Sequence, residues 1–201
     1  MENNVSGKTL MDIGFHCIHI EVAQNATIKK GASVKCNATF AVTDGVLYIS
    51  SEYDGVTLII PQVSFETIEI DTKYGSVTCD GLSCNQLSIS SAQSVKVENS
   101  SVNVCEISST YDAVHVSKST IETLNIRAAQ NVSIELDDFC YIEITSEYDS
   151  VKVKYNGNRL VNVNCSTTFG SVEAKGTFYG NTDCDKKIVI SAAQNIKLLS
   201  K

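Results

Sequence analysis

Three Tyr-Asp pairs supply the carboxylates in this sequence that could do chemistry. Asp54, Asp112 and Asp149 each follow a tyrosine in a similar local context. Carboxylates held close together bind calcium or act as general acid and base in glycan cleavage. The expected turns of this set are two levels of a stacked fold apart, roughly 10 Å, which is too far for shared coordination. We therefore expect the three aspartates to form turns, and predict no catalytic residues.

The three histidines give only a weak indication of metal binding. His115 stands between two valines, and the alternation of side chains along a strand points it outward. His16 and His19 flank Cys17, but a ligand cluster there would need further acids or cysteines that the sequence does not place nearby. We predict no metal-binding residues and no cofactor-binding residues.

The chain contains eight cysteines, and the sequence leaves two interpretations of them open. An even count suits disulfides in an exported protein. Free cysteine is also a small buried hydrophobe, and this interpretation is favoured because Cys79 stands where other repeats have Val or Ile. The cysteines are Cys17, Cys36, Cys79, Cys84, Cys105, Cys140, Cys165 and Cys184.

Composition and motifs exclude several classes of protein. Sixteen Lys and Arg residues are scattered among twenty-three acids, for a net charge of −7. Without a basic stripe the chain lacks the electrostatic footprint of a nucleic-acid-binding protein. There is no nucleophile elbow, phosphate-binding loop or dinucleotide fingerprint, so we predict no small-molecule substrate and no enzyme.

The candidate residues lie in a repeat, and the repeat predicts the fold. Three consecutive copies are ISSTYDAVHV from Ile107, IRAAQNVSI from Ile126 and ITSEYDSVKV from Ile144, whose starts are 19 and then 18 residues apart. Self-similarity at a short period indicates a stacked repeat architecture. Related copies begin at Ile20, Ile49, Ile70, Ile89, Cys165 and Ile190.

Apolar residues alternate with polar ones on both sides of each turn, which is the pattern of strands with one buried face. Two short strands cannot bury that face alone, but stacked coils can, so we expect parallel sheets around an apolar column. From Ile89 to Ile144 the turns carry Gln, Tyr, Gln and Tyr in order, which places an aromatic residue on every second coil. The Asp or Gly after each aromatic suits a turn residue near positive φ.

The two ends of the chain lead to a prediction about assembly. We expect residues 1–19 to form a lid or capping segment and residues 20–201 to form the solenoid, with the structure of 29–48 and 176–187 undecided. The last repeat, from Ile190, is as regular as an internal one, so it should leave an open edge. An open edge predicts a homo-oligomer that pairs through its terminal coils.

The repeat I-x-[ST]-x-Y-[DG]-x-V-x-V resembles the bacterial family of putative adhesins, domains of unknown function, over Ile20 to Leu198. The resemblance implies an all-β, right-handed parallel β-helix, here of about ten coils of 18–21 residues. It implies no known enzymatic activity and no catalytic residues. The chain is also similar to bactofilins, cytoplasmic β-helices that polymerise end to end, although their Gly-rich coil pattern is absent.

Two functions therefore stay open. The chain is either a structural or interaction solenoid that self-associates into dimers or filaments, or an adhesin-like module displayed at the cell surface. The first residues do not form a secretory signal, and no stretch approaches the 18 apolar residues that span a membrane. As written, the sequence predicts a cytoplasmic protein with no membrane span. If an export segment was removed, an extracellular or cell-surface location follows.

Overall fold

The computed structural model describes residues 14–32, 35–61, 63–180 and 183–200, and every regular element in these ranges is a β-strand. All of these strands belong to one curled sheet, and most of their pairings are parallel. In chain order the strands are β1 Cys17–Val22, β2 Ala26–Lys30, β3 Lys35–Cys36, β4 Phe40–Thr43, β5 Val46–Ser51, β6 Val56–Ile60, β7 Phe65–Thr72, β8 Val77–Asp80, β9 Ser83–Ser91 and β10 Val95–Glu98. They continue with β11 Ser101–Ser109, β12 Val114–Ala128, β13 Val132–Asp138, β14 Tyr141–Ser146, β15 Val151–Tyr155, β16 Val161–Thr167, β17 Val172–Lys175, β18 Phe178–Tyr179, β19 Lys187–Ala192 and β20 Ile196–Ser200.

The predicted apolar column is confirmed. Ile107 is the Cα partner of Ile126, and Ile126 is the partner of Ile144, across parallel strands. All three side chains are buried and belong to one continuous hydrophobic core. Because side chains alternate across a strand, the residues between these isoleucines face outward, which explains the alternating sequence pattern. His115 is exposed as predicted.

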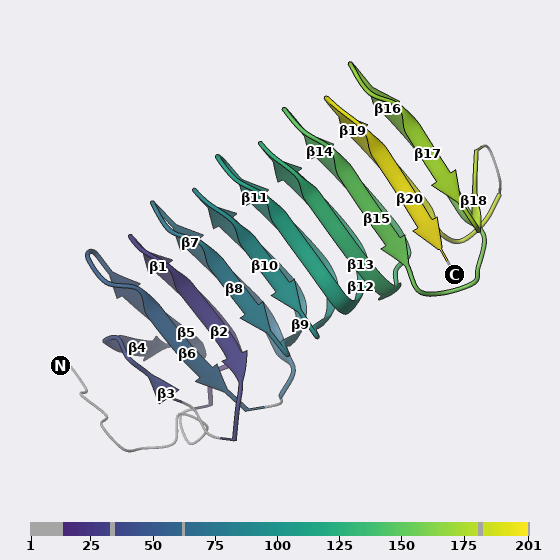
Figure 1. The fold of residues 1–201 in the computed structure, drawn as a ribbon. Coiled ribbons are helices and arrows are strands. Elements are labelled where there is room, and N and C mark those ends of the chain that lie inside the picture. Colours follow the sequence, from purple (N-terminus) through teal and green to yellow (C-terminus); the bar gives the residue numbers. More distant parts are fainter. Residues whose placement is uncertain (1–13, 33–34, 62, 181–182, 201) are drawn as a thin grey trace.

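The strands stack as two columns joined at the turns (Figure 1). One repeat forms one level of the stack: a first-column strand, a turn with the aromatic or glutamine, and a second-column strand. The long strand β12 serves two levels, because its beginning pairs with β10 and its end pairs with β11. The first column runs β5, β1, β7, β9, β11, β12, β14, β19, β16, and the second runs β6, β2, β8, β10, β12, β13, β15, β20, β17.

The order of levels departs from the order of the chain at both ends (Figure 1). The first repeat, β1–β2, lies between β5–β6 and β7–β8. The last repeat, β19–β20, lies between β14–β15 and β16–β17. The prediction that the Ile190 repeat forms the open edge is therefore wrong, because β19 and β20 are paired on both sides. The outermost level at this end is β16–β17.

A buried lysine fastens the inserted last repeat. Lys186 directly precedes β19, and its side chain is 3% exposed. Its Nζ lies 2.5 Å from Asp138 Oδ1, donates to the backbone carbonyl of Phe139, and sits 5.1 Å and 5.7 Å from the ring centroids of Phe139 and Tyr155. A buried ammonium needs such partners to offset its lost hydration. These contacts hold the start of β19 against the connection between β13 and β14.

At the other end, part of the undecided segment 29–48 forms antiparallel strands. β4 pairs with β5 and β3 pairs with β6, so they flank the outermost parallel level. Phe15 stacks on Phe65 with ring centroids 5.8 Å apart. Residues 1–13 lie outside the described residues, so the predicted lid over 1–19 stays a prediction, as do the right hand of the coil and the number of coils.

Candidate functional site

The inserted terminal repeats produce a regular row of aromatic side chains along one edge of the stack. In the chain, two aromatic repeats follow each other at Tyr53 and Tyr74 and again at Tyr148 and Phe169. In the structure, a glutamine repeat is inserted into each of these gaps. Aromatic and glutamine turns then alternate without interruption along the stack. In stack order the turn residues are Tyr53, Gln24, Tyr74, Gln93, Tyr111, Gln130, Tyr148, Gln194 and Phe169.

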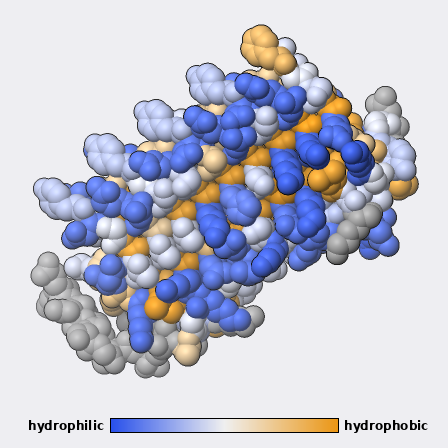
Figure 2. All heavy atoms as spheres, viewed as in Figure 1, coloured by the Kyte–Doolittle hydropathy of each residue, from blue (hydrophilic) through white to orange (hydrophobic). Residues whose placement is uncertain are grey.

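The five aromatic side chains of this aromatic row are exposed by between 57% for Tyr74 and 85% for Phe169. Figure 2 shows groups that protrude at intervals along the upper edge of the molecule. Two levels of a parallel stack are roughly 9.6 Å apart, which sets the spacing of neighbouring rings. Exposed aromatic side chains can supply much of the energy of an interface, because their burial removes a large apolar area from water.

Buried hydroxyl groups hold the turns that present the row. Ser109 Oγ lies 2.8 Å from the carbonyl oxygens of both Asp112 and Gln93, which belong to its own turn and to the neighbouring turn. Ser146 Oγ makes the same pair of contacts to Asp149 and Gln130. Each hydroxyl group therefore closes its own turn and also connects that turn to the preceding level of the stack. This explains the Ser or Thr three positions before the Asp or Gly of the repeat.

The glycines that replace aspartate after the aromatic have a different reason from the predicted one. The prediction of positive φ at this position is wrong for Gly75 and Gly170, which are not among the residues with positive φ. A Cβ on Gly75 would lie 2.3 Å from the backbone carbon of Gln24, and one on Gly170 would lie 2.3 Å from that of Gln194. Both glycines make room for an inserted terminal repeat.

The aspartates of the other aromatic turns brace their own backbone. Asp112 Oδ1 accepts a hydrogen bond from the Ala113 amide at 2.8 Å, and Asp149 Oδ1 accepts one from Ser150 at 2.7 Å. Neither these two nor Asp54, whose φ also is not positive, belongs to a potential metal-ligand group in the described part of the chain. Their lack of a catalytic role stays a prediction.

The aromatic row carries negative charge. Five acids and one lysine directly flank its aromatic residues in sequence, while the residues flanking the four glutamines are uncharged. The lysine, Lys73, places its Nζ 5.3 Å from the ring centroid of Tyr74. The row therefore has carboxylates next to its aromatic residues in sequence, and one of its rings lies close to a cation. The acids are Glu52, Asp54, Asp112, Glu147 and Asp149.

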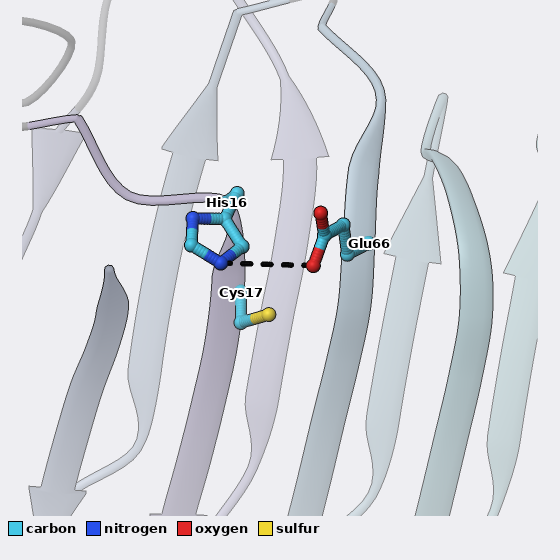
Figure 3. A group of neighbouring side chains, drawn as sticks. All are labelled: His16, Cys17 and Glu66. Atoms are coloured by element: carbon cyan, nitrogen blue, oxygen red, sulfur yellow. Dashed lines mark ion pairs between the residues drawn. The ribbon is translucent and has the colours of Figure 1, made fainter. Parts of the chain in front are cut away.

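A second group of polar side chains lies at the start of β1 (Figure 3). The pairing of β1 with β7 brings Glu66 to His16 and Cys17, and their donor atoms lie within 4.8 Å of one another. His16 Nε2 is 3.6 Å from Glu66 Oε2, and both side chains are more than half exposed. The sequence could not place Glu66 here because fifty residues separate it from His16. A tetrahedral zinc site needs a fourth ligand, and the prediction of no metal ligands remains untested.

The cysteines are all free, and several support the core. Cys79, Cys84 and Cys105 are buried, and for Cys79 this agrees with the interpretation drawn from its place in the repeat. Burial raises the pKa of the Cys84 thiol to about 12, and it raises the pKa of Cys79 and Cys105 as well. Cys140 differs from these three because it is exposed.

The sequence model of one protein family matches residues 19–196, which is nearly the whole chain. That family is Toastrack DUF4097. The chain belongs to it. The resemblance to a family of adhesin-like β-solenoid domains of unknown function is thereby confirmed. Toastrack membership agrees with the all-β stacked fold and with the row of levels in Figure 1.

Two solved structures are similar to this Toastrack domain. One, from Bacteroides fragilis, is described as a "putative adhesin" and shares 12% identity, 92% coverage of each chain and a TM-score of 0.42. The other, from Clostridium sporogenes, is described as a "putative cell adhesion protein" and shares 11% identity, with 96% of this chain and 97% of that chain covered and a TM-score of 0.33. Among curated proteins, none matches the sequence significantly. Among the described residues there is no helix with the length and hydrophobicity that crossing a membrane requires.

Proposed function

We propose that this Toastrack domain is a non-enzymatic interaction module that binds an extended partner along its aromatic row. One observation carries the proposal: the glutamine repeats inserted near both ends make the aromatic turns alternate over the whole stack. A partner that lies along the stack meets a ring at every second level. Rings that are this exposed in the free protein can bury much apolar surface when a partner binds.

The row suits a long, narrow partner better than a compact one. The distance from the level of Tyr53 to that of Phe169 is eight steps of the stack, roughly 38 Å at the spacing of parallel strands. A compact partner would touch only a few rings at once. An extended polymer repeats its own groups along its axis, so each ring adds to the affinity. This is the surface that we assign to the adhesin-like alternative.

A second candidate, self-association, uses a different surface. The level β16–β17 pairs with β19 and β20 on one side. On its other side, the described residues provide only β18, which pairs at Val161 and Asn162. Val172 is 45% exposed and Cys165 is only half-buried. An unpaired strand edge with apolar side chains is a template for another copy, so the predicted homo-oligomer would form here and not at the Ile190 repeat.

The test of the primary proposal uses arrays of linear polysaccharides and unstructured polypeptides, probed with fluorescently labelled protein. We expect the wild-type protein to bind some of these polymers and the Tyr53→Ser, Tyr111→Ser, Tyr148→Ser triple variant to lose that binding. The control is Tyr48→Ser with Tyr179→Ser, since these tyrosines are 45% and 50% exposed but lie outside the row. A wild-type protein that binds no polymer, or a triple variant that binds as well as wild type, would refute the proposal.

A further inference from the structure

The spacing and charge of the aromatic row indicate the kind of polymer that it binds. We propose that the partner is a cationic polypeptide segment in the polyproline II conformation, with Lys or Arg at every third residue. This inference rests on the proposed function of the row. It adds the chemical class of the partner, and that class follows from three observations on the row and its flanking residues.

The first observation is the repeat distance. A polyproline II helix has three residues per turn and rises about 3.1 Å per residue, so equivalent side chains recur about every 9.3 Å. Neighbouring rings of the row are roughly 9.6 Å apart. A β-strand repeats its side chains on one face about every 6.7 Å and falls out of register after one ring. About thirteen residues of polyproline II chain would span the row from Tyr53 to Phe169.

The second observation is the charge. Five acids flank the aromatic residues in sequence against the single cation Lys73, and the chain as a whole carries −7. Glu52 and Asp54 stand on either side of Tyr53, and Glu147 and Asp149 stand on either side of Tyr148. An acidic polymer would be repelled by this edge, and a neutral one would gain nothing from its net charge. A cationic partner is attracted both before and after contact.

The third observation is that the row already attracts one cation. The Lys73 ammonium lies 5.3 Å from the centroid of the Tyr74 ring, within the range of a cation–π contact. Tyr53, Tyr111 and Tyr148 have no lysine beside them in sequence and carry carboxylates instead. We infer that the partner's Lys or Arg side chains take the equivalent places over these three rings, with the flanking carboxylates as counter-charges.

The experiment measures fluorescence anisotropy of labelled peptides with the 201-residue chain. The test peptide contains five Lys-Pro-Pro triplets. The spacing control has the same composition with its lysines in one block, and the charge control contains five Glu-Pro-Pro triplets. A neutral linear oligosaccharide provides the fourth arm, by competition and by direct titration. We expect the regular cationic peptide to bind most tightly, with an affinity that falls at high salt.

Variants test which residues carry the binding. Loss of one exposed cation–π contact should weaken the affinity by about 2- to 5-fold, so Tyr111→Ser with Tyr148→Ser should weaken it by about 4- to 25-fold. The control pair Tyr48→Ser with Tyr179→Ser should leave it within about 2-fold. Lys73→Gln should strengthen binding, because it removes the cation that competes for the Tyr74 ring. Circular dichroism would verify that each variant keeps its strands.

Three results would overturn the inference: equal binding of the regular and block peptides, tighter binding of the acidic peptide, or no effect of the tyrosine variants on the regular peptide. If the oligosaccharide binds through the row and the cationic peptide does not, the partner class is wrong while the proposed interaction function stands. If neither polymer binds at micromolar protein, the partner class is again wrong. The array of polysaccharides and polypeptides described above then tests whether the proposed interaction function holds.

Discussion

At the scale of single residues, the residue type in a turn depends on the neighbouring level of the stack as well as on the turn itself. Asp112 and Asp149 brace their own backbone, whereas Gly75 and Gly170 stand where the backbone of another repeat approaches within the volume of a Cβ. Gly therefore stands in the two aromatic levels that come directly after an inserted terminal repeat in the stack order, and the other three aromatic levels have Asp. The sequence of a single repeat suggested only a local explanation for the glycines, namely a positive φ in the turn.

The buried cysteines lead to a prediction about pH. Burial raises the pKa of Cys84 to about 12 in the folded protein, whereas a thiol in the unfolded chain ionises near pH 8.5. The folded state therefore holds more protons than the unfolded state above that pH. The contribution of each buried thiol to the free energy of unfolding is therefore complete below the pKa of the unfolded chain. It falls as the pH rises towards the folded pKa, by up to about 1.4 kcal/mol per pH unit and per thiol. Denaturant unfolding between these limits would measure this slope.

Two variants separate this effect from other titrations. Cys84→Val should remove part of the alkaline loss of stability, and Cys140→Ser, which replaces an exposed thiol, is the control variant. A thiol reagent near neutral pH should modify Cys140 quickly and Cys84 only as fast as the protein opens. Rapid modification of Cys84 in the folded protein would contradict its described burial.

At the scale of elements, the two terminal repeats lie one level in from the ends of the stack. The last repeat contributes the buried residues Ile188, Ile190, Ile196 and Leu198, and Lys186 fastens its start. The outer level β16–β17 depends on this inserted repeat for its pairing along both columns. The order of levels is therefore a property of long-range pairing and cannot be found from the repeat pattern, which all levels share.

Truncation distinguishes this order from a stack in chain order. A chain that ends at Gly180 loses only the last repeat, and a chain that ends at Asn156 loses both that repeat and β16–β18. We expect the shorter chain to unfold cooperatively at the higher temperature, because each of its levels keeps a paired neighbour, whereas the longer chain also carries β16–β17, whose partners β19 and β20 are missing. In the longer chain, residues 161–175 lose their partners and should be cleaved by proteases. Thermal unfolding and limited proteolysis measure both outcomes, and a more stable longer chain would contradict the inserted position.

At the scale of the whole molecule, the aromatic row and the open edge β16–β17 allow two kinds of association. The row extends along the stack and suits a different chain, whereas the edge continues the stack and suits a second copy. The two are compatible, since pairing of two edges would leave most of the rings exposed. Self-association through the edge depends on the concentration of the protein, whereas binding along the row depends on the presence of a partner.

Self-association through the open edge is tested by sedimentation velocity over a range of concentrations. We expect wild-type protein to form dimers or larger species, and Val172→Lys to shift the distribution towards monomer, because an outward lysine on an edge strand opposes strand addition. The control is Val104→Lys, at an exposed position of an interior level. A wild-type protein that remains monomeric at the highest concentration, or a Val172→Lys variant that assembles normally, would contradict the second candidate.

The sequence by itself determined the local form of this protein. Alternating apolar residues such as Ile107, Ile126 and Ile144 predicted parallel strands around a single core, because burial of one strand face is a local requirement that each repeat states in its own residues. Only the tertiary structure decided which repeats are neighbours. Gln24 and Gln194 enter the gaps between aromatic levels, and Glu66 reaches His16, through pairings between distant segments. Strands with the same pattern pair almost equally well, so the order follows from specific contacts, such as those of Gly75 and Lys186, that only the assembled stack creates.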